Sequence, residues 1–440
     1  MALIFSISGL RGISEKELTC EMVSFYTQAF VKFLNARLLV LGRDTRKSGI
    51  KFEREIIKSV NLSGCDVVNL KIAPTPTVVF MVKKLKAHGG IVITASHNPK
   101  EYNGLKFVSP EGRFLNGKEF LLFNKFLKEF EYQKVQRKTG SFWYEKDPLK
   151  FHIKEIIKIL NLKNLGFKVG VDAVNGSASE ALPELLNEVG CEVHKLNCAP
   201  GGDFVRGPEP TPENIQGLCS LVRKKKLDLG FALDPDGDRL AIVDEKGRPL
   251  SEENTIVLAT DYILSQKKGN VVVNLSTTAL MDYVVKKHHA HLYRTKVGEP
   301  NVVERMEEVK AVIGGEGNGG VIYPEINMTR DALTGAGIIL KLLKERKKKV
   351  AEIIDSYPKY YMIKEKISLS KKDFEQREKY LIKKFSGKID RTDGLKITTR
   401  NFWIHIRPSN TEPLVRLIGE GRDWEEIERI IREVEKVLRG

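Results

Sequence analysis

The chain has 440 residues, of which 41% are hydrophobic and 30% charged, a balance typical of a soluble folded protein rather than a disordered one. No run approaches the roughly 18 apolar residues of a membrane-spanning helix, and the first residues, MALIFSISGLRG, lack the basic leader and long apolar core of a signal peptide. The net charge of +16 predicts an anionic ligand, for which phosphorylated metabolites and nucleic acid both qualify.

The cysteine and lysine patterns limit which cellular compartment and which binding partners we expect. The five cysteines show no paired CxxC spacing, which predicts reduced thiols in a cytoplasmic protein rather than a disulfide framework or a zinc site. The densest basic run, KERKKK, lacks interleaved aromatic residues and favours a solvated helix end over a nucleic-acid site. We therefore expect neither nucleic acid nor a membrane as a partner.

An internal repeat organises most of the chain. Apolar strands at 38–41, 168–171 and 270–273 each enter a polar turn, a helical stretch and a second strand. Such strand–turn–helix–strand units are typical of parallel βαβ folding. The repeat predicts an α/β protein with three similar mixed-sheet domains.

A further apolar strand follows each unit and ends in a polar loop. Residues 91–93 lead to Ser96, residues 229–233 lead to the run DPDGDR, and residues 311–313 lead to GGEGNGG. Ligands gather at the carboxyl ends of strands in open α/β sheets. The three loops are therefore expected to point into one cleft and to divide an active site between them.

The sequence changes in character after about residue 360. Short strands and a final amphipathic helix over 424–438 replace the repeat and predict a smaller C-terminal α+β domain. The four expected domains, arranged around a central cleft, cover residues 1–150, 151–250, 251–358 and 359–440.

Ser96 lies where a buried strand, Ile91 to Ile93, stops in the run TASHNP. Backbone N–H groups are free at such a point and favour an anionic oxygen, so Ser96 can carry a phosphoryl group or act as a nucleophile. The alternative is that Ser96, His97 and Asn98 cap a helix before Pro99.

Asp234, Asp236 and Asp238 lie two residues apart in DPDGDR, just before Arg239. Three carboxylates at this spacing repel one another unless a hard cation joins them, and oxygen ligands favour Mg²⁺ or Ca²⁺. The alternative is an exposed acidic turn. An EF-hand loop is disfavoured, because Arg239 occupies the position that needs glycine and strands flank the run.

Two further polar loops complete the candidate site. In GGEGNGG, Glu316 can accept hydrogen bonds from neighbouring sugar hydroxyls beside Asn318, whereas the alternative is a flexible glycine turn. The tail loop RPSNTEPLVR combines guanidinium groups with hydroxyl and amide groups, a phosphate-binding set whose alternative is a surface salt-bridge cluster. Its candidate residues are Arg407, Ser409, Asn410, Thr411 and Arg416.

Taken together, these motifs resemble the α-D-phosphohexomutase family, which includes phosphoglucomutases, phosphomannomutases and phosphoglucosamine mutases. TASHNP resembles the phosphoserine loop, DPDGDR the metal loop, GEGNGG the sugar loop and RPSNTEP the phosphate loop, in family order. The resemblance implies an enzyme that interconverts hexose 1-phosphate and hexose 6-phosphate. A phosphoserine enzyme and a hexose 1,6-bisphosphate, which also serves as activator, would mediate the reaction.

The resemblance also implies roles for individual residues. Ser96 would carry the phosphoryl group, and Mg²⁺ would be held by Ser96 together with the three aspartates. Lys106, Arg239 and Arg11 would assist the transfer, and His97 would act as a general base or orient the loop. Glu316 and Asn318 would bind the sugar, and the tail loop would bind the phosphate that does not react. We expect a monomer or a homodimer.

Three departures from the family pattern bear on the substrate. Gly320 stands where the family usually has a histidine, so any acid/base role of that histidine is lost. Glu299 stands where many relatives have histidine or aspartate and favours an amino sugar, since an acid could pair with an ammonium. The tail reads SNT where many phosphoglucosamine mutases read SGT, which argues the other way. Glucose, mannose and glucosamine phosphates stay open.

Two rival functions keep the same residues. A metal-dependent phosphatase could use the same serine-phosphate intermediate, and an inactive sugar-phosphate-binding protein could bind without transfer. The intact set of Ser96, the three aspartates and Arg239 argues against the inactive protein.

Overall fold

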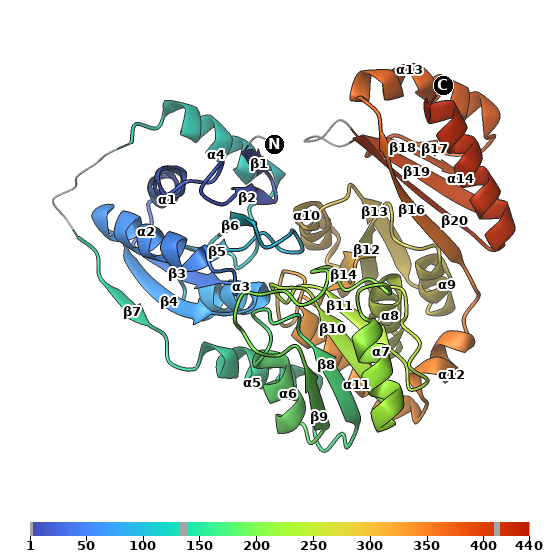
Figure 1. Cartoon of the computed structure of the whole chain (residues 1–440), viewed down its shortest axis with the longest axis horizontal. Helices are drawn as coiled ribbons and strands as arrows, with labels where there is room; N and C mark the ends of the chain where they lie inside the picture. The colour runs from blue at the N-terminus through green and yellow to red at the C-terminus, as the bar shows by residue number, and fades with distance from the viewer. Residues whose placement is uncertain (1–2, 133–138, 409–413, 440) are drawn as a thin grey trace.

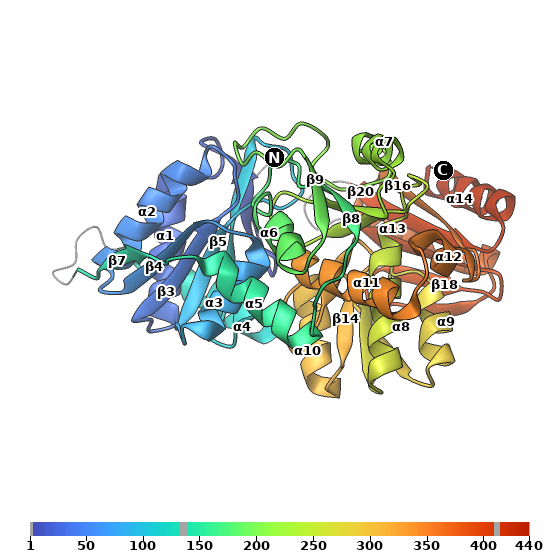
Figure 2. The same ribbon diagram turned by 90° about the horizontal axis from the view of Figure 1, so that it is seen from below.

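The computed structural model describes residues 3–132, 139–408 and 414–439 of the chain. These residues form four consecutive α/β regions, with the N-terminal region at one end of the molecule, the C-terminal region at the other, and the two middle regions between them (Figures 1 and 2). Within the described ranges, no helix is long and apolar enough to cross a membrane.

The N-terminal region contains a mixed sheet in the order β1-β2-β6-β5-β3-β4-β7. One face packs on α1, α2 and α4 through a core rich in phenylalanine, and the other face packs on α3. Its elements are β1 (Ile4–Ser6), β2 (Gly9–Ile13), α1 (Cys20–Phe33), β3 (Leu38–Arg43), α2 (Gly49–Leu62), β4 (Asp66–Ile72), α3 (Thr75–Lys84), β5 (Gly89–Ile93), β6 (Tyr102–Val108), α4 (Gly117–Glu129) and β7 (Phe142–Tyr144).

The second region contains a sheet in the order β11-β10-β8-β9. Its strands β8 and β10 are almost wholly buried, as expected where helices cover both faces of a parallel sheet. Its elements are α5 (Pro148–Leu160), β8 (Lys168–Asp172), α6 (Ala181–Glu188), β9 (Glu192–Leu196), α7 (Gln216–Lys225), β10 (Leu229–Leu233) and β11 (Leu240–Val243).

The third region contains a sheet in the order β13-β12-β14-β15. Its long helices α8 and α11 share one continuous hydrophobic core with α5 and α6 of the second region. Its elements are α8 (Glu253–Gln266), β12 (Asn270–Asn274), α9 (Leu280–Lys287), β13 (His291–Thr295), α10 (Glu299–Val309), β14 (Ile313–Glu316), β15 (Gly320–Ile322), α11 (Ala332–Arg346) and α12 (Val350–Asp355).

The C-terminal region contains an antiparallel sheet in the order β16-β20-β19-β18-β17. The amphipathic helix α14 buries Ile427, Ile431 and Val434 against it. Its elements are β16 (Tyr361–Ser368), α13 (Lys371–Lys384), β17 (Lys388–Asp390), β18 (Leu395–Thr398), β19 (Phe402–Pro408), β20 (Leu414–Gly421) and α14 (Trp424–Arg439). The predicted architecture of three mixed-sheet α/β domains and one α+β domain is confirmed.

The three predicted repeat units share one topology. In each, the first strand pairs in parallel with the second and with the strand that comes next: β3 with β4 and β5, β8 with β9 and β10, and β12 with β13 and β14. An antiparallel strand then completes the unit, namely β6, β11 or β15. The loops of the candidate site are therefore the equivalent connections in the three units.

The domain boundaries stay a prediction, but two of them can be placed on the elements. The expected boundary at residue 150 falls inside α5, whose residues Ile153 and Ile156 are fully buried. The expected boundary at 358 falls between α12 and β16. The chain is helical across residue 150 because α5 packs on α11 and α3.

Candidate active site

Ser96 lies in the connection between β5 and β6, almost wholly buried and with a positive φ of 51°. Its backbone N–H donates to Thr94 Oγ1 at 2.8 Å, and its carbonyl accepts from Arg46 Nη2 at 2.9 Å. Within residues 94–101, which are all described, the chain forms turns and not a helix. The alternative in which Ser96, His97 and Asn98 cap a helix is therefore wrong.

Arg46 in the turn after β3 holds the serine loop in place. Its side chain is fully buried, pairs with Asp44, and also donates to the carbonyl of Asn98 at 2.5 Å. Asp44 in turn accepts from Thr94 Oγ1 at 2.6 Å. This cation therefore binds the backbone of the loop, and the left-handed conformation of Ser96 is stabilised by contacts that compensate its strain.

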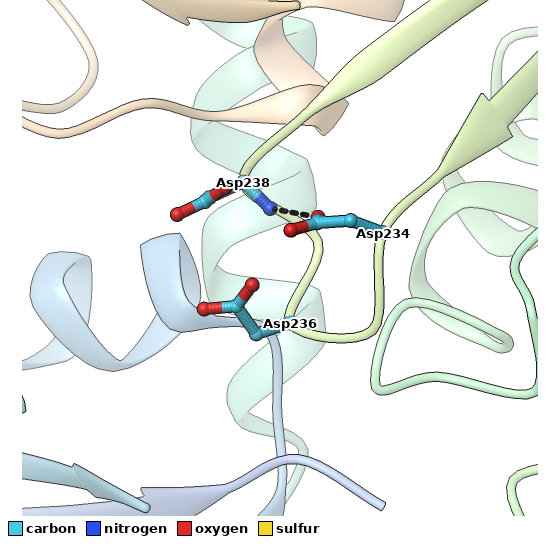
Figure 3. A group of neighbouring side chains, drawn as sticks. All are labelled: Asp234, Asp236 and Asp238. Atoms are coloured by element: carbon cyan, nitrogen blue, oxygen red, sulfur yellow. Dashed lines mark hydrogen bonds between the residues drawn. The ribbon is translucent and has the colours of Figure 1, made fainter. Parts of the chain in front are cut away.

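Asp234, Asp236 and Asp238 occupy the connection between β10 and β11, and Figure 3 shows their carboxylates gathered around the turn. All three are buried, and one oxygen from each lies within 4.8 Å of the others. The N–H groups of Asp238 and Arg239 both donate to Asp234 Oδ1 at 3.1 Å and fix the turn. Burial and the flanking strands exclude the exposed acidic turn and the EF-hand.

Some oxygens of these carboxylates lack hydrogen bonds, which suits a site for a hard cation. Asp236 Oδ1 and Asp238 Oδ1 are buried without a hydrogen-bond partner, which is costly in a protein interior. Burial, followed by repulsion from Asp238 and Asp236, raises the pKa of Asp234 well above its usual value. Buried, mutually repelling oxygen ligands with unused lone pairs are what Mg²⁺ or Ca²⁺ requires.

Ser96 is close to this acidic loop. Ser96 Oγ donates to Asp234 Oδ2 at 3.3 Å and lies 3.3 Å from His97 Nδ1. Burial, then repulsion by Arg239 and Arg11, lowers the pKa of His97 well below its usual value, so the imidazole is neutral at pH 7. The structure thus brings Ser96, His97 and the metal loop together across two domains.

The predicted cations lie beside the serine loop and the acidic loop. Lys106 Nζ lies 2.7 Å from Asp236 Oδ2 and 3.1 Å from Asp238 Oδ2. Arg11 Nη1 donates to Asn98 Oδ1 at 3.2 Å, and its pKa is lowered to about 10, first by burial and then by repulsion from Arg239. Arg239 pairs with Glu209, an acid that no motif marked.

Glu316 is the last residue of β14, so the sugar loop begins three residues later than a strand over 311–313 predicts. Glu316 Oε1 accepts from Asn274 Nδ2 and from the N–H of Gly298, both at 2.9 Å. Oε2 accepts from Arg330 Nη1 at 2.8 Å and from Asn318 Nδ2 at 3.4 Å. These contacts fix the carboxylate, which contradicts the alternative of a flexible glycine turn.

Arg330 is a site residue that none of the sequence motifs marked. It immediately precedes Asp331, the N-cap of α11, whose side chain accepts from the N–H of Leu333 at 3.0 Å. The Arg330 guanidinium reaches Asp238 Oδ2 at 2.7 Å and Glu316 Oε2 at 2.8 Å. It joins the metal loop to the sugar loop, and only its position before a capping aspartate could have drawn attention to it.

Thr75 is a second residue that no motif marked. Its hydroxyl donates to Asp236 Oδ2 at 2.7 Å, and its N–H donates to the carbonyl of Asp236 at 2.8 Å. Thr75 opens α3, so the N-terminal region holds the metal loop through this helix as well as through Lys106.

The tail loop is described only at its two ends. Arg407 on β19 faces Arg416 on β20 in register, and Arg407 Nη1 lies 3.6 Å from Asp393 Oδ2. Ser409, Asn410 and Thr411 lie outside the described residues. The phosphate-binding role of this loop stays a prediction.

The C-terminal region contacts the third region beside the sugar loop. His405 Nδ1 lies 2.8 Å from Ser276 Oγ, and Glu420 Oε2 accepts from the N–H of Ala279 at 2.6 Å and from Trp403 Nε1 at 2.7 Å. The N–H of Val297 donates to Asp393 Oδ2 at 2.9 Å. Arg407, which pairs with Asp393, is thus connected to the segment whose Gly298 N–H donates to Glu316 Oε1.

Comparison with known proteins covers nearly the whole chain. Residues 2–132, 150–247 and 251–361 match the models of the phosphoglucomutase/phosphomannomutase alpha/beta/alpha domains I, II and III, and residues 362–437 match that of the C-terminal domain. A phosphoglucomutase/phosphomannomutase of Thermococcus kodakarensis is 36% identical, and the match covers 100% of both chains. A probable phosphoglucosamine mutase of Methanopyrus kandleri is 31% identical over 100% of this chain and 98% of its own.

Solved structures share the fold. A phosphoglucomutase/phosphomannomutase family protein of Burkholderia thailandensis matches with a TM-score of 0.87 at 24% identity, over 99% of this chain and 98% of its own. The N-acetylphosphoglucosamine mutase of Aspergillus fumigatus, in complex with GlcNAc-6P and magnesium, matches with a TM-score of 0.63 at 15% identity, over 100% of this chain and 96% of its own.

Proposed function

Because the chain belongs to the phosphoglucomutase/phosphomannomutase family of enzymes, we propose that it interconverts hexose 1-phosphate and hexose 6-phosphate through a phosphoserine at Ser96. The observation that carries the proposal is the 3.3 Å contact between Ser96 Oγ and Asp234 Oδ2. It joins a buried hydroxyl of one domain to the acidic loop of the next. Group transfer at a serine needs this proximity.

The acidic loop supplies the metal site of the proposal. Asp234, Asp236 and Asp238, with an oxygen of the group on Ser96, would hold Mg²⁺, which when bound neutralises charge that develops on the transferring phosphoryl group. The magnesium in the Aspergillus fumigatus structure supports this choice of ion. Thr75 and Lys106 keep Asp236 in place by donating to its Oδ2 at 2.7 Å each.

The first transfer moves the phosphoryl group from Ser96 to the free hydroxyl of a hexose 1-phosphate. The bond from phosphorus to the sugar oxygen forms as the bond to Ser96 Oγ breaks, and the proton of the sugar hydroxyl ends on Oγ. His97 Nδ1, at 3.3 Å, orients that oxygen. Lys106, Arg11 and Arg239 place positive charge where the phosphoryl oxygens pass.

The second transfer runs in the opposite sense on the other phosphate. The hexose 1,6-bisphosphate turns over in the site, its 1-phosphate returns to Ser96, and hexose 6-phosphate leaves. The same bisphosphate, supplied from outside, would phosphorylate an unmodified Ser96 and so activate the enzyme.

Glu316 and Asn318 are the proposed sugar contacts. Glu316 already accepts from four donors, about as many as a carboxylate can accommodate. The longest of these contacts, from Asn318 Nδ2 at 3.4 Å, is the one that a sugar hydroxyl displaces at least cost. Arg407, Ser409, Asn410, Thr411 and Arg416 are proposed to bind the phosphate that does not react.

The test supplies purified protein with Mg²⁺, a trace of hexose 1,6-bisphosphate, and glucose, mannose and glucosamine 1-phosphates in separate reactions. Phosphorus NMR should show the 6-phosphates appear. Ser96→Ala should abolish conversion, whereas Ser220→Ala, on the exposed face of α7, should leave it unchanged. Free phosphate without 6-phosphate would make the protein a phosphatase, and binding without turnover would make it an inactive sugar-phosphate-binding protein.

A further inference from the structure

The Arg330 guanidinium lies among three carboxylates that come from separate elements. Its Nη2 contacts Asp238 Oδ2 at 2.7 Å, its Nη1 contacts Glu316 Oε2 at 2.8 Å, and its Nε lies 3.0 Å from Glu299 Oε2. The side chain is 9% exposed. A permanent positive charge therefore lies next to the carboxylate that is proposed to bind the sugar.

Gly320, the first residue of β15, makes this position of Arg330 possible. A Cβ atom at Gly320 would lie 2.2 Å from Arg330 Cδ and 2.8 Å from Arg330 Cγ, distances that packed atoms do not adopt. The space that a side chain at position 320 would fill is thus occupied by the long side chain of Arg330. The cation of the sugar site is supplied from the residue before α11 and not from the sugar loop.

Glu299 at the start of α10 is fully engaged by the same segment. Its Oε1 accepts from Thr329 Oγ1 and from the N–H of Arg330, the latter at 3.1 Å, while Oε2 faces Arg330 Nε. Glu299 is 5% exposed. The sequence pattern favours an amino sugar, because Glu299 could pair with an ammonium. In the structure, however, Thr329 and Arg330 already contact both oxygens of Glu299, which argues against that role.

We propose that Arg330, seated in the space left by Gly320, makes this site select a neutral hexose phosphate over an amino-hexose phosphate. The inference rests on the proposed mutase function and names its substrate class. Arg330 pairs with both Glu316 and Glu299, so a substrate ammonium would have to compete with this guanidinium for either carboxylate. That ammonium would lie near a buried guanidinium, and like charges brought together at a desolvated interface are strongly disfavoured.

The test compares kcat/KM for glucose 1-phosphate and glucosamine 1-phosphate at a pH where the amine is charged. The two sugars differ little in size, so the ratio reports charge. The wild type should favour glucose 1-phosphate by about tenfold or more, and Arg330→Gln should reduce that ratio by about tenfold. Arg330→Lys, which keeps the charge, should retain most of the ratio. Arg305→Gln, on the exposed side of α10, is the matched control and should not change it.

A binding measurement separates this inference from the mutase proposal. Calorimetry on Ser96→Ala and on Ser96→Ala/Arg330→Gln, with the same two sugar phosphates, reports the ratio of Kd values without turnover. A ratio of Kd values that falls about tenfold on loss of Arg330 supports the inference even where no conversion occurs. An unchanged ratio, or a wild type that prefers glucosamine 1-phosphate, overturns it, whereas absence of conversion of either sugar counts only against the mutase.

Discussion

Asp261 on α8 and the loop of Asp234, Asp236 and Asp238 are both buried acidic sites, but their oxygens are partnered differently. Asp261 Oδ1 contacts Lys287 Nζ at 2.9 Å and His288 Nε2 at 2.6 Å, and Oδ2 accepts from Arg346 Nη1 at 2.6 Å and Tyr357 OH at 2.5 Å. In the loop, by contrast, Asp236 Oδ1 and Asp238 Oδ1 have no hydrogen-bond partner among the described residues.

The difference separates a structural acid from a functional one. A single carboxylate saturated by donors from α9, α11 and the turn after α12 ties helices together. Three buried carboxylates that repel one another reduce the stability of the folded chain, and such clusters are candidates for functional sites. The pKa values show the same contrast: although burial opposes it, the bond from Arg346 helps hold the pKa of Asp261 well below its usual range. In the loop the contrast holds for Asp234, whose pKa is raised by burial and by its acidic neighbours. Although burial opposes it, Lys106 and Arg330 help hold the pKa values of Asp236 and Asp238 below their usual range.

The largest expected effect is a loss of activity when Asp234, in the loop of three aspartates, is replaced. Asp234→Asn keeps the shape and the Oδ1 acceptor but removes one charge from the metal site, so mutase activity should fall by about a thousandfold. The stability of the metal-free protein should stay equal or rise, because repulsion is relieved. Steady-state kinetics and urea denaturation measure the two effects.

Magnesium itself provides the control for that variant. Mg²⁺ at about 100 times its Kd should stabilise the wild type by about 2.7 kcal/mol, and chelation should remove the effect. Asp234→Asn should lose most of this stabilisation. A thermal shift with Mg²⁺ that is equal in wild type and variant would show that the loop is not the metal site.

Replacing Asp261, whose two oxygens both have partners, should have the opposite result: stability should fall and activity should not. Asp261→Asn leaves Lys287 and Arg346 without their counter-charge and should destabilise the fold by about 2 to 3 kcal/mol, less than a fully buried pair because both cations are partly exposed. The folded fraction should keep its kcat and its response to Mg²⁺. Urea denaturation combined with kinetics tests this, and a large loss of kcat at unchanged stability would contradict the contrast.

The smallest expected effect is the pH dependence of a third buried acid, Glu253 at the start of α8. Burial, opposed by Lys364 and reinforced by Glu252, raises its pKa to about 7. Because the folded state binds the proton more tightly than the unfolded state, Glu253 stabilises the fold at low pH. That contribution falls as pH rises through about 7.

Glu253→Gln should remove this slope. The variant should be more stable than the wild type near pH 8, by on the order of 1 kcal/mol, with the difference vanishing near pH 4. The pH dependence of urea unfolding measures it. Asp261 predicts the opposite slope, since its lowered pKa makes its contribution disappear as pH falls below its usual range. If the free energy of unfolding changed with pH in parallel for Glu253→Gln and the wild type, Glu253 would not be the source of this slope.

The sequence by itself determined the repeat and the chemistry of its loops. A strand that is buried on both faces and stops at a polar turn is a local pattern, so Ser96, the three aspartates and Glu316 could be found without knowing how the chain folds. The same holds for the final helix, where Ile427, Ile431 and Val434 have helical spacing. Local spacing did not decide whether Ser96 caps a helix, because the path of the chain after Pro99 depends on its tertiary contacts.

Only the tertiary structure decided how the loops are held and which charges remain free. Arg46 proved to bind the serine-loop backbone, Thr75 and Lys106 to hold Asp236, and Arg330 to seal Glu299 and pair Glu316. Most of these partners are far apart in the sequence, and their meeting depends on how whole domains pack. A carboxylate's availability to substrate is set by the donors around it, which a sequence pattern of near neighbours does not contain.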